Sequence, residues 1–133
     1  MTIKAVKAII LVKKNYLLQL RDRKKNISFP NHWGLFGGRI DKKEKNTIAL
    51  KREIKEETNL NIKINRRVFN VDFDIIGLKK KRNLQYYECE IIGKKKIKLS
   101  EGKKYKFFSF QQIKKLNIVP MDFVALKSHY LHN

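Results

Sequence analysis

The sequence predicts an α/β fold, in which a mixed β-sheet carries helices on its faces. The chain has 133 residues, enough for one hydrophobic core and too few for two. Hydrophobic residues make up 42% and charged residues 33%, which is typical of folded proteins. The segments alternate as strands, helix, strands and helix, the order of a mixed sheet covered by helices. We therefore expect residues 1–133 to form a single domain.

Two strands and a loop are expected near the N-terminus. Residues 5–12 alternate weakly and then run apolar, as a largely buried strand does. Residues 16–20 return as a second strand after a turn at residues 13–15. Residues 21–31 are polar and predict a loop.

A short apolar segment, residues 32–40, contains Gly37 and Gly38. Glycine allows backbone angles that other residues resist, so a tight turn with exposed backbone groups is expected there. A helix should follow to about Thr58, with Asn46 or Thr47 as its cap. Asn59 comes next in sequence and tolerates the left-handed conformation that ends helices.

The second half of the chain predicts more strands and two helices. The expected strands are residues 68–76, 84–92 and 105–110. Residues 93–100 are expected to form a turn and a short strand. The two helices are residues 111–116 and 121–131, the second opened by Pro120 at a position that helices accept.

The formal net charge of +20 has two interpretations. It can attract polyanions, either nucleic acid or a phosphate-rich substrate. Alternatively, lysine fills an ordinary solvated surface. Lysine supplies most of the excess and is scattered along the chain, whereas nucleic-acid surfaces more often interleave aromatic residues and concentrate arginine. The ordinary surface is therefore favoured over a nucleic-acid partner.

Membrane insertion and disulfide bonding are not expected. No apolar run approaches the roughly 18–20 residues that span a bilayer, and the N-terminal stretch lacks the cleavage site of a signal peptide. The single cysteine, Cys89, excludes an internal disulfide framework, so a reducing cytoplasm is the expected compartment. Cys89 is predicted to be an inward-facing strand residue and not a nucleophile.

Three carboxylates, Glu53, Glu56 and Glu57, share one face of the predicted helix because their spacing is i, i+3 and i+4. Like charges at this spacing repel, so a positive group must offset them. Arg52 and Lys55 are close in sequence, and a divalent cation such as Mg²⁺ prefers carboxylate and carbonyl oxygens. The alternative is an acidic, solvated helix face.

The segment from Gly38 to Leu60 resembles the signature of the Nudix hydrolases, G-x5-E-x7-R-E-U-x-E-E-x-G-U, where U is a bulky aliphatic residue. The one departure is Asn59, which stands at the second glycine and can adopt the same left-handed turn. Residues 17–22 also resemble the family's strand ahead of the motif. Residues 101–108 resemble its later Glu-Gly segment and aromatic strand.

The resemblance implies a Nudix-type mixed β-sheet sandwiched between helices (α/β/α). It also implies a Mg²⁺-dependent pyrophosphohydrolase, with Mn²⁺ as a substitute, that lets water attack the diphosphate of a small nucleotide. The favoured substrate is a nucleoside triphosphate, intact or oxidised. The alternatives are ADP-ribose or sugar nucleotides, RNA 5′ ends, and a non-catalytic nucleotide-binding module. A homodimer stays open.

The resemblance assigns the acidic residues to metal binding and catalysis. Glu56 and Glu57 are the implied principal metal ligands, joined by Glu53 and the Gly37 carbonyl. Arg52 is implied to pair with Glu44 and Glu53. The implied proton acceptor is Glu53, with Glu101 as the alternative.

Four residues are weaker candidates for substrate binding. Arg21 stands where related hydrolases bind phosphate, but it is equally well explained as a surface arginine. His32 could contact a nucleotide, although a loop histidine usually has no special role. Asp122 lies near where relatives recognise the base edge, but the helix dipole alone explains an acidic residue there. Phe36 could belong to a base-stacking wall or to the core.

Overall fold

The computed structural model describes residues 2–21, 29–75, 77, 80–100 and 104–132. Expectations for residues 22–28 and for Glu101 lie outside the described residues. The strands of the described structure are β1 (Thr2–Val12), β2 (Asn15–Leu20), β3 (Trp33–Gly34), β4 (Phe36–Arg39), β5 (Asn61–Ile75), β6 (Lys80–Ile92) and β7 (Lys104–Phe108). Its helices are α1 (Asn46–Thr58), α2 (Phe110–Ile113) and α3 (Pro120–Leu131).

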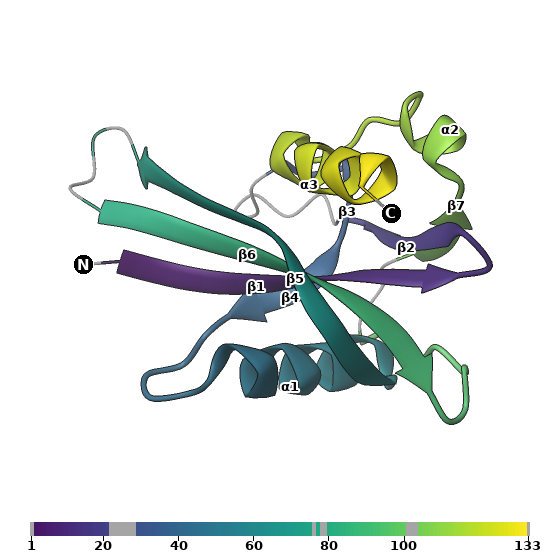
Figure 1. Cartoon of the computed structure of the whole chain (residues 1–133), viewed down its shortest axis with the longest axis horizontal. Coiled ribbons are helices and arrows are strands. Elements are labelled where there is room, and N and C mark those ends of the chain that lie inside the picture. Colours follow the sequence, from purple (N-terminus) through teal and green to yellow (C-terminus); the bar gives the residue numbers. More distant parts are fainter. Residues whose placement is uncertain (1, 22–28, 76, 78–79, 101–103, 133) are drawn as a thin grey trace.

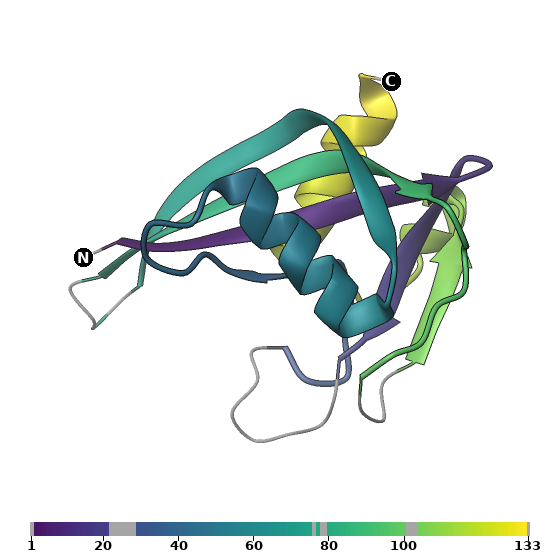
Figure 2. The same ribbon diagram turned by 90° about the horizontal axis from the view of Figure 1, so that it is seen from below.

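Strand β1 organises the mixed sheet of the described residues. It pairs in parallel with β6 and antiparallel with β2 and β4, in the order β3-β2-β1-β6-β5. Strand β7 pairs with β2 on the outer side. Helix α1 covers one face of the sheet and α3 lies across the other (Figures 1 and 2). The predicted sheet between helices is therefore confirmed.

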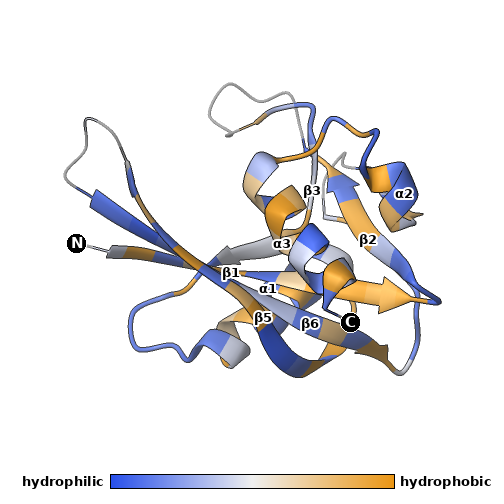
Figure 3. Cartoon of the chain, turned by 45° about the horizontal axis from the view of Figure 1, so that its top comes forward, coloured by the Kyte–Doolittle hydropathy of each residue, from blue (hydrophilic) through white to orange (hydrophobic). Residues whose placement is uncertain are grey.

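Alternation along β1 separates two hydrophobic clusters, because successive strand residues point to opposite faces. Val6, Ala8 and Ile10 pack in the cluster under α1. Ala5, Ile9 and Leu11 pack in the cluster under α3, to which β2 also contributes. Figure 3 shows hydrophobic stretches on α3 and β2, the two elements that meet in this second cluster.

Helix α1 ends as expected but begins differently. Asn59 adopts the left-handed conformation, with φ of 65°. The cap expected from Asn46 or Thr47 is wrong: Lys45 is the N-cap residue and makes no side-chain cap bond. The Asn46 amide instead donates to Gln85 Oε1 at 2.7 Å, so a contact across the sheet replaces the local one.

Residues 94–99 form no strand, in contrast to the short strand expected there. The segment instead runs along the end of α1. The Lys98 amide donates to the Thr58 carbonyl at 2.9 Å, and the Ser100 amide donates to the Glu57 carbonyl at 3.2 Å. These bonds satisfy carbonyls that the last turn of a helix leaves without partners. Among the described residues, no helix is long and apolar enough to cross a membrane.

Candidate active site

Two glycines of β4 bring the carboxylates of α1 against the sheet. A Cβ atom on Gly38 would lie only 2.3 Å from Glu53 Cδ and 2.5 Å from Glu53 Oε2, so this carboxylate occupies the space that a side chain would fill. The Gly37 amide donates to Glu57 Oε1 at 3.2 Å. The expected meeting of the acidic helix face with the Gly37–Gly38 segment is therefore present for Glu53 and Glu57.

Arg52 holds three glutamates in one network. Its Nε and Nη2 donate to the two oxygens of Glu44, at 2.8 and 3.0 Å, in a bidentate contact. Its Nη1 lies 3.0 Å from Glu53 Oε1 and 3.4 Å from Glu56 Oε2. A planar guanidinium suits this forked geometry better than an ammonium group would. The pairing of Arg52 with Glu44 and Glu53 is the one that the resemblance implies.

The pKa values of this network diverge. Hydrogen bonds from Arg52 and from the Asp41 backbone hold the pKa of Glu44 below its usual range. Burial raises the pKa of Glu53 above its usual range, although Arg52 opposes that shift. The hydrogen bond to Glu44 raises the pKa of Arg52 further, so the guanidinium stays charged. The pKa values of the two carboxyl groups bound by Arg52 are therefore shifted in opposite directions, downward for Glu44 and upward for Glu53.

The donor set fits a hard divalent cation. Carboxylate and carbonyl oxygens are the ligands that Mg²⁺ prefers, and the glycine at position 38 leaves room for a carboxylate beside the β4 backbone. Glu56 is the most open member, with its side chain 59% exposed. Within the described ranges, no three acidic, histidine or cysteine side chains are grouped as tightly as a loaded metal site requires. Arg52 instead occupies the space between Glu44, Glu53 and Glu56.

Arg21 and His32 meet at the base of the loop that joins β2 to β3. The Arg21 amide donates to the His32 carbonyl at 2.8 Å, and the Arg21 carbonyl accepts from the Asn31 amide at 3.0 Å. The His32 ring contacts Phe29 edge-on at 5.5 Å. The Arg21 side chain also passes beside Gly34, where a Cβ atom would lie 3.6 Å from Arg21 Cδ.

Asp122 lies in the first turn of α3 and is fully buried. Its Oδ1 accepts from Lys7 Nζ at 2.8 Å and from the Tyr86 hydroxyl at 2.7 Å. Its Oδ2 accepts from Lys7 Nζ at 3.0 Å and from the Leu35 amide at 2.9 Å. Lys7 is not among the site residues expected from the sequence. The available signal was a lysine at an inward position of β1, on the face shared by Ala5 and Ile9.

A second buried polar chain joins α3 to the sheet. The Tyr16 hydroxyl lies 2.8 Å from His129 Nδ1, and His129 Nε2 lies 2.9 Å from Glu88 Oε1. Burial acts to raise the pKa of Glu88, but His129 and Arg66 outweigh it and the pKa is lowered. Burial raises the pKa of Tyr16 to about 12. These contacts link residues more than 40 positions apart, so no local sequence pattern predicts them.

Phe36 and Cys89 take core positions. Phe36 is 1% exposed and packs under α1 with Leu50 and Ile54, so it has no free face on which a base could stack. Cys89 is also 1% exposed, as expected for an inward strand residue. Burial raises the pKa of its thiol to about 12, which keeps the sulfur in the unreactive thiol form.

The family model that matches the sequence is the NUDIX domain, over residues 1–127. The chain belongs to the NUDIX family. It is a hydrolase of phosphoanhydride bonds, and hydrolases of this family act on small nucleotide-linked substrates. Comparison with curated protein sequences finds no match.

Solved Nudix structures share the fold. The MutT protein from Methanosarcina mazei Go1 is 22% identical, with a TM-score of 0.80 over 99% of this chain and 96% of that one. A NUDIX hydrolase from Nitrosomonas europaea is 15% identical, with a TM-score of 0.81 over 99% and 90%. The C. elegans Ap4A hydrolase is 21% identical, with a TM-score of 0.73 over 99% and 98%. At these identities, the likeness establishes the fold alone.

Proposed function

We propose that the protein is a Mg²⁺-dependent pyrophosphohydrolase that cleaves the diphosphate of a nucleotide, with a nucleoside triphosphate as its favoured substrate. The observation that carries the proposal is the arrangement of Glu53 and Glu57 against the backbone of Gly37 and Gly38, with Arg52 bridging the acidic groups. The substrate is a polyanion, so hydrolysis requires neutralised charge, an oriented water and a proton acceptor.

The metal-binding part of the proposal rests on the oxygen ligands. Glu56 and Glu57 would hold Mg²⁺, or Mn²⁺ in its place, together with Glu53 and the Gly37 carbonyl. The cation would supply charge neutralisation at the phosphates and acidify a bound water. Arg52 keeps Glu44 and Glu53 in fixed positions by the contacts described above.

Glu53 is the proposed proton acceptor, and Glu101 is the alternative. The Glu53 carboxylate is a suitable general base for an attacking water. Its hydrogen bond to Arg52 Nη1 orients the carboxylate against Gly38. Arg21 and His32 are proposed to contact the substrate from the loop that their backbone bond closes. Phe36 is not proposed in this role, because it is buried in the core.

The remaining assignments follow from the same proposal. The protein acts as one domain on a small nucleotide in the cytoplasm. Solved relatives differ in the substrates that their names state; one of those cited above is an Ap4A hydrolase. The alternative substrates remain those that the family resemblance implies, namely ADP-ribose, sugar nucleotides and RNA 5′ ends, and the charge of +20 is the observation that favours RNA.

A substrate panel tests the proposal. Nucleoside triphosphates, ADP-ribose, sugar nucleotides and 5′-triphosphorylated RNA are assayed with Mg²⁺ at near-physiological salt. We expect turnover of triphosphates, and strong turnover of RNA alone would overturn the favoured substrate.

The Glu57→Gln variant distinguishes an enzyme from a protein that only binds nucleotides. We expect kcat to fall at least about a hundredfold, by analogy with the loss of other groups that stabilise transition-state charge. The control is Glu90→Gln, which removes an exposed acidic residue of β6 outside the site. Unchanged turnover by Glu57→Gln would exclude Glu57 from the proposed role.

A further inference from the structure

Lys7 has a position that ordinary surface lysines do not share. Its side chain lies on the α3 face of β1 and is only 16% exposed. The stem passes over Gly37, where a Cβ atom would come within 2.9 Å of Lys7 Cγ. The ammonium then reaches both oxygens of Asp122, at 2.8 and 3.0 Å. Lys7 is therefore a partly buried cation in the middle of β1, fixed by the first turn of α3.

The carboxylate of Asp122 has no capacity left for a ligand. An ionised carboxylate offers about four acceptor positions. Lys7 takes two of them, and Tyr86 and the Leu35 amide take the others. Because Asp122 is also fully buried, a donor on a substrate could reach it only by breaking one of these bonds.

Lys7, in contrast, retains a donor. An ammonium group carries three N–H bonds, and Asp122 accepts at most two of them. Across the part of the chain that the structure describes, Lys7 Nζ has no other hydrogen-bond partner. The group on this face that can meet a substrate is therefore a cationic donor, and it prefers acceptor atoms.

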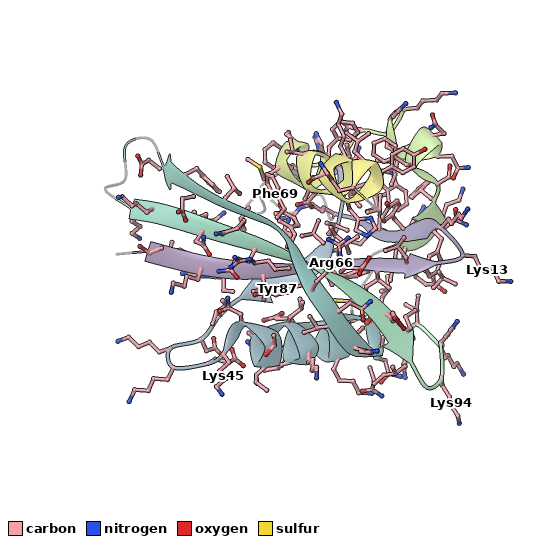
Figure 4. All side chains as sticks on the ribbon, viewed as in Figure 1. Lys13, Lys45, Arg66, Phe69, Tyr87 and Lys94 are labelled. Atoms are coloured by element: carbon pink, nitrogen blue, oxygen red, sulfur yellow. The ribbon has the colours of Figure 1, made fainter. Side chains whose placement is uncertain are left out.

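The sheet register places Lys7 next to the proposed catalytic site and next to an aromatic row. Lys7 pairs with Gly37 of β4, whose amide contacts Glu57. On its other side it pairs with Tyr86 of β6, which in turn pairs with Phe69 of β5. Figure 4 shows Phe69 on the α3 side of the sheet. Lys7 and the Glu53 carboxylate lie on opposite faces of the sheet. Among the described strands β4 pairs only with β1 and is an edge of the sheet, so a nucleotide whose diphosphate meets the carboxylates would bring its base to Lys7 by passing this edge.

We propose that Lys7 is a specificity-determining residue that selects nucleobases with a carbonyl oxygen at position 6 of a purine or position 4 of a pyrimidine, with Asp122 as the residue that positions it. This inference rests on the proposed function for the identity of the substrate. Guanine presents O6 and N7 as adjacent acceptors, whereas adenine presents an amino donor beside N7. At position 4, uracil likewise presents a carbonyl oxygen and cytosine an amino group.

Binding of non-hydrolysable nucleotides tests the inference without requiring turnover. The probes are the α,β-methylene analogues of GTP, ATP, UTP and CTP, titrated calorimetrically. We expect the wild type to bind each keto base about tenfold more tightly than the matching amino base, the scale of one good contact to a base edge. Lys7→Met should reduce each ratio to within about twofold, and Lys7→Arg should retain it.

Two further variants serve as controls. Lys4→Met makes the same change on the same strand at an exposed position of the opposite face, so it should keep the wild-type ratios. Because Lys7→Met leaves the buried Asp122 without its cation, folding is checked by thermal unfolding. The double variant Lys7→Met/Asp122→Asn removes both charges together and should likewise lose the discrimination.

Equal binding of keto and amino bases by the wild type would overturn the inference, as would a folded Lys7→Met variant that keeps the wild-type ratios. Hydrolysis assayed in parallel separates the two proposals. Turnover that depends on Glu57 without base discrimination would refute only the role of Lys7. Lys7-dependent discrimination without turnover would refute only the proposed function.

Discussion

Replacing Gly38 by alanine should remove activity while leaving the fold intact. The added Cβ atom would lie 2.3 to 2.7 Å from three atoms of the Glu53 carboxyl group, distances that no real contact shows. The carboxyl group is the free end of a flexible side chain, so it can move away. Its movement separates Glu53 from Arg52 and from the β4 backbone. We expect kcat to fall on the order of a hundredfold, the typical effect of losing one preorganised charge.

Stability should change little in Gly38→Ala. Gly38 does not have positive φ, so alanine can adopt its backbone conformation. A compatible Gly→Ala change even stabilises by about 0.4–1 kcal/mol through the unfolded state. We therefore expect the melting temperature to stay within about 5 °C of wild type, because 1 kcal/mol shifts it by roughly 3–5 °C in a domain of this size.

Gly37→Ala is the matched control on the adjacent residue. Its Cβ atom would lie 2.1 Å from the Val6 carbonyl oxygen and 2.7 Å from Lys7 Cα, and both are backbone atoms that cannot rotate away. Overpacking of this kind costs about 1–3 kcal/mol or more, so the melting temperature should fall by about 5–10 °C. Wild-type kcat in Gly38→Ala would refute the reasoning, as would equal thermal losses in the two variants.

Three further predictions concern pH, thiol chemistry and salt. Because the pKa of Glu88 is lower in the folded protein, the ionised carboxylate stabilises the fold at pH values above the usual pKa of glutamate. This stabilisation is lost as the pH falls through the pKa of Glu88 in the folded protein. The difference in melting temperature between wild type and Glu88→Gln should therefore shrink between pH 7 and pH 3; a constant difference would contradict this. Cys89, with its pKa raised to about 12, should resist a thiol reagent at pH 8 until the protein unfolds; labelling of the folded protein within minutes would contradict its burial. The charge of +20 should make kcat/KM fall with added salt, because the Debye length shortens from about 30 Å at 0.01 M to about 10 Å at 0.1 M. Single methionine variants of the scattered, outward-pointing Lys13, Lys45 and Lys94 (Figure 4) should each change kcat/KM by less than about twofold, and a tenfold effect of one of them would indicate a local binding site.

The elements with a strong local pattern could be predicted from the sequence. The apolar run of residues 5–12 lies in β1, and the left-handed Asn59 ends α1. The cap of α1 could not be predicted, because the Asn46 side chain donates to Gln85 on β6 and not to the helix backbone. Residues 94–99 were predicted as partly strand because their pattern does not show that hydrogen bonds to the end of α1 hold the segment.

Only some residues of the candidate site could likewise be predicted from a local sequence pattern. The helix spacing placed three glutamates on one face, and the structure brings two of them to the glycines of β4. Phe36 could not be assigned between base stacking and core, because both uses have the same strand pattern; the packing of Leu50 and Ile54 decides for the core. Lys7 could not be assigned to the site from the sequence, because its partner Asp122 is 115 residues away.

Gly37 and Gly38 connect these two parts of the site, because successive strand residues face opposite sides of the sheet. Gly38 opens the α1 face to the carboxylate of Glu53, while Gly37 opens the α3 face to the stem of Lys7. A side chain at either position would close one face and leave the other open. The two substitutions should therefore have different effects. Alanine at position 38 displaces a group proposed to cleave the substrate and lowers kcat, whereas alanine at position 37 disturbs the pairing of β4 with the strand that carries Lys7 and lowers stability. If both proposals hold, a nucleotide is bound at its diphosphate and at its base, and these two parts should contribute separately to rate and to affinity.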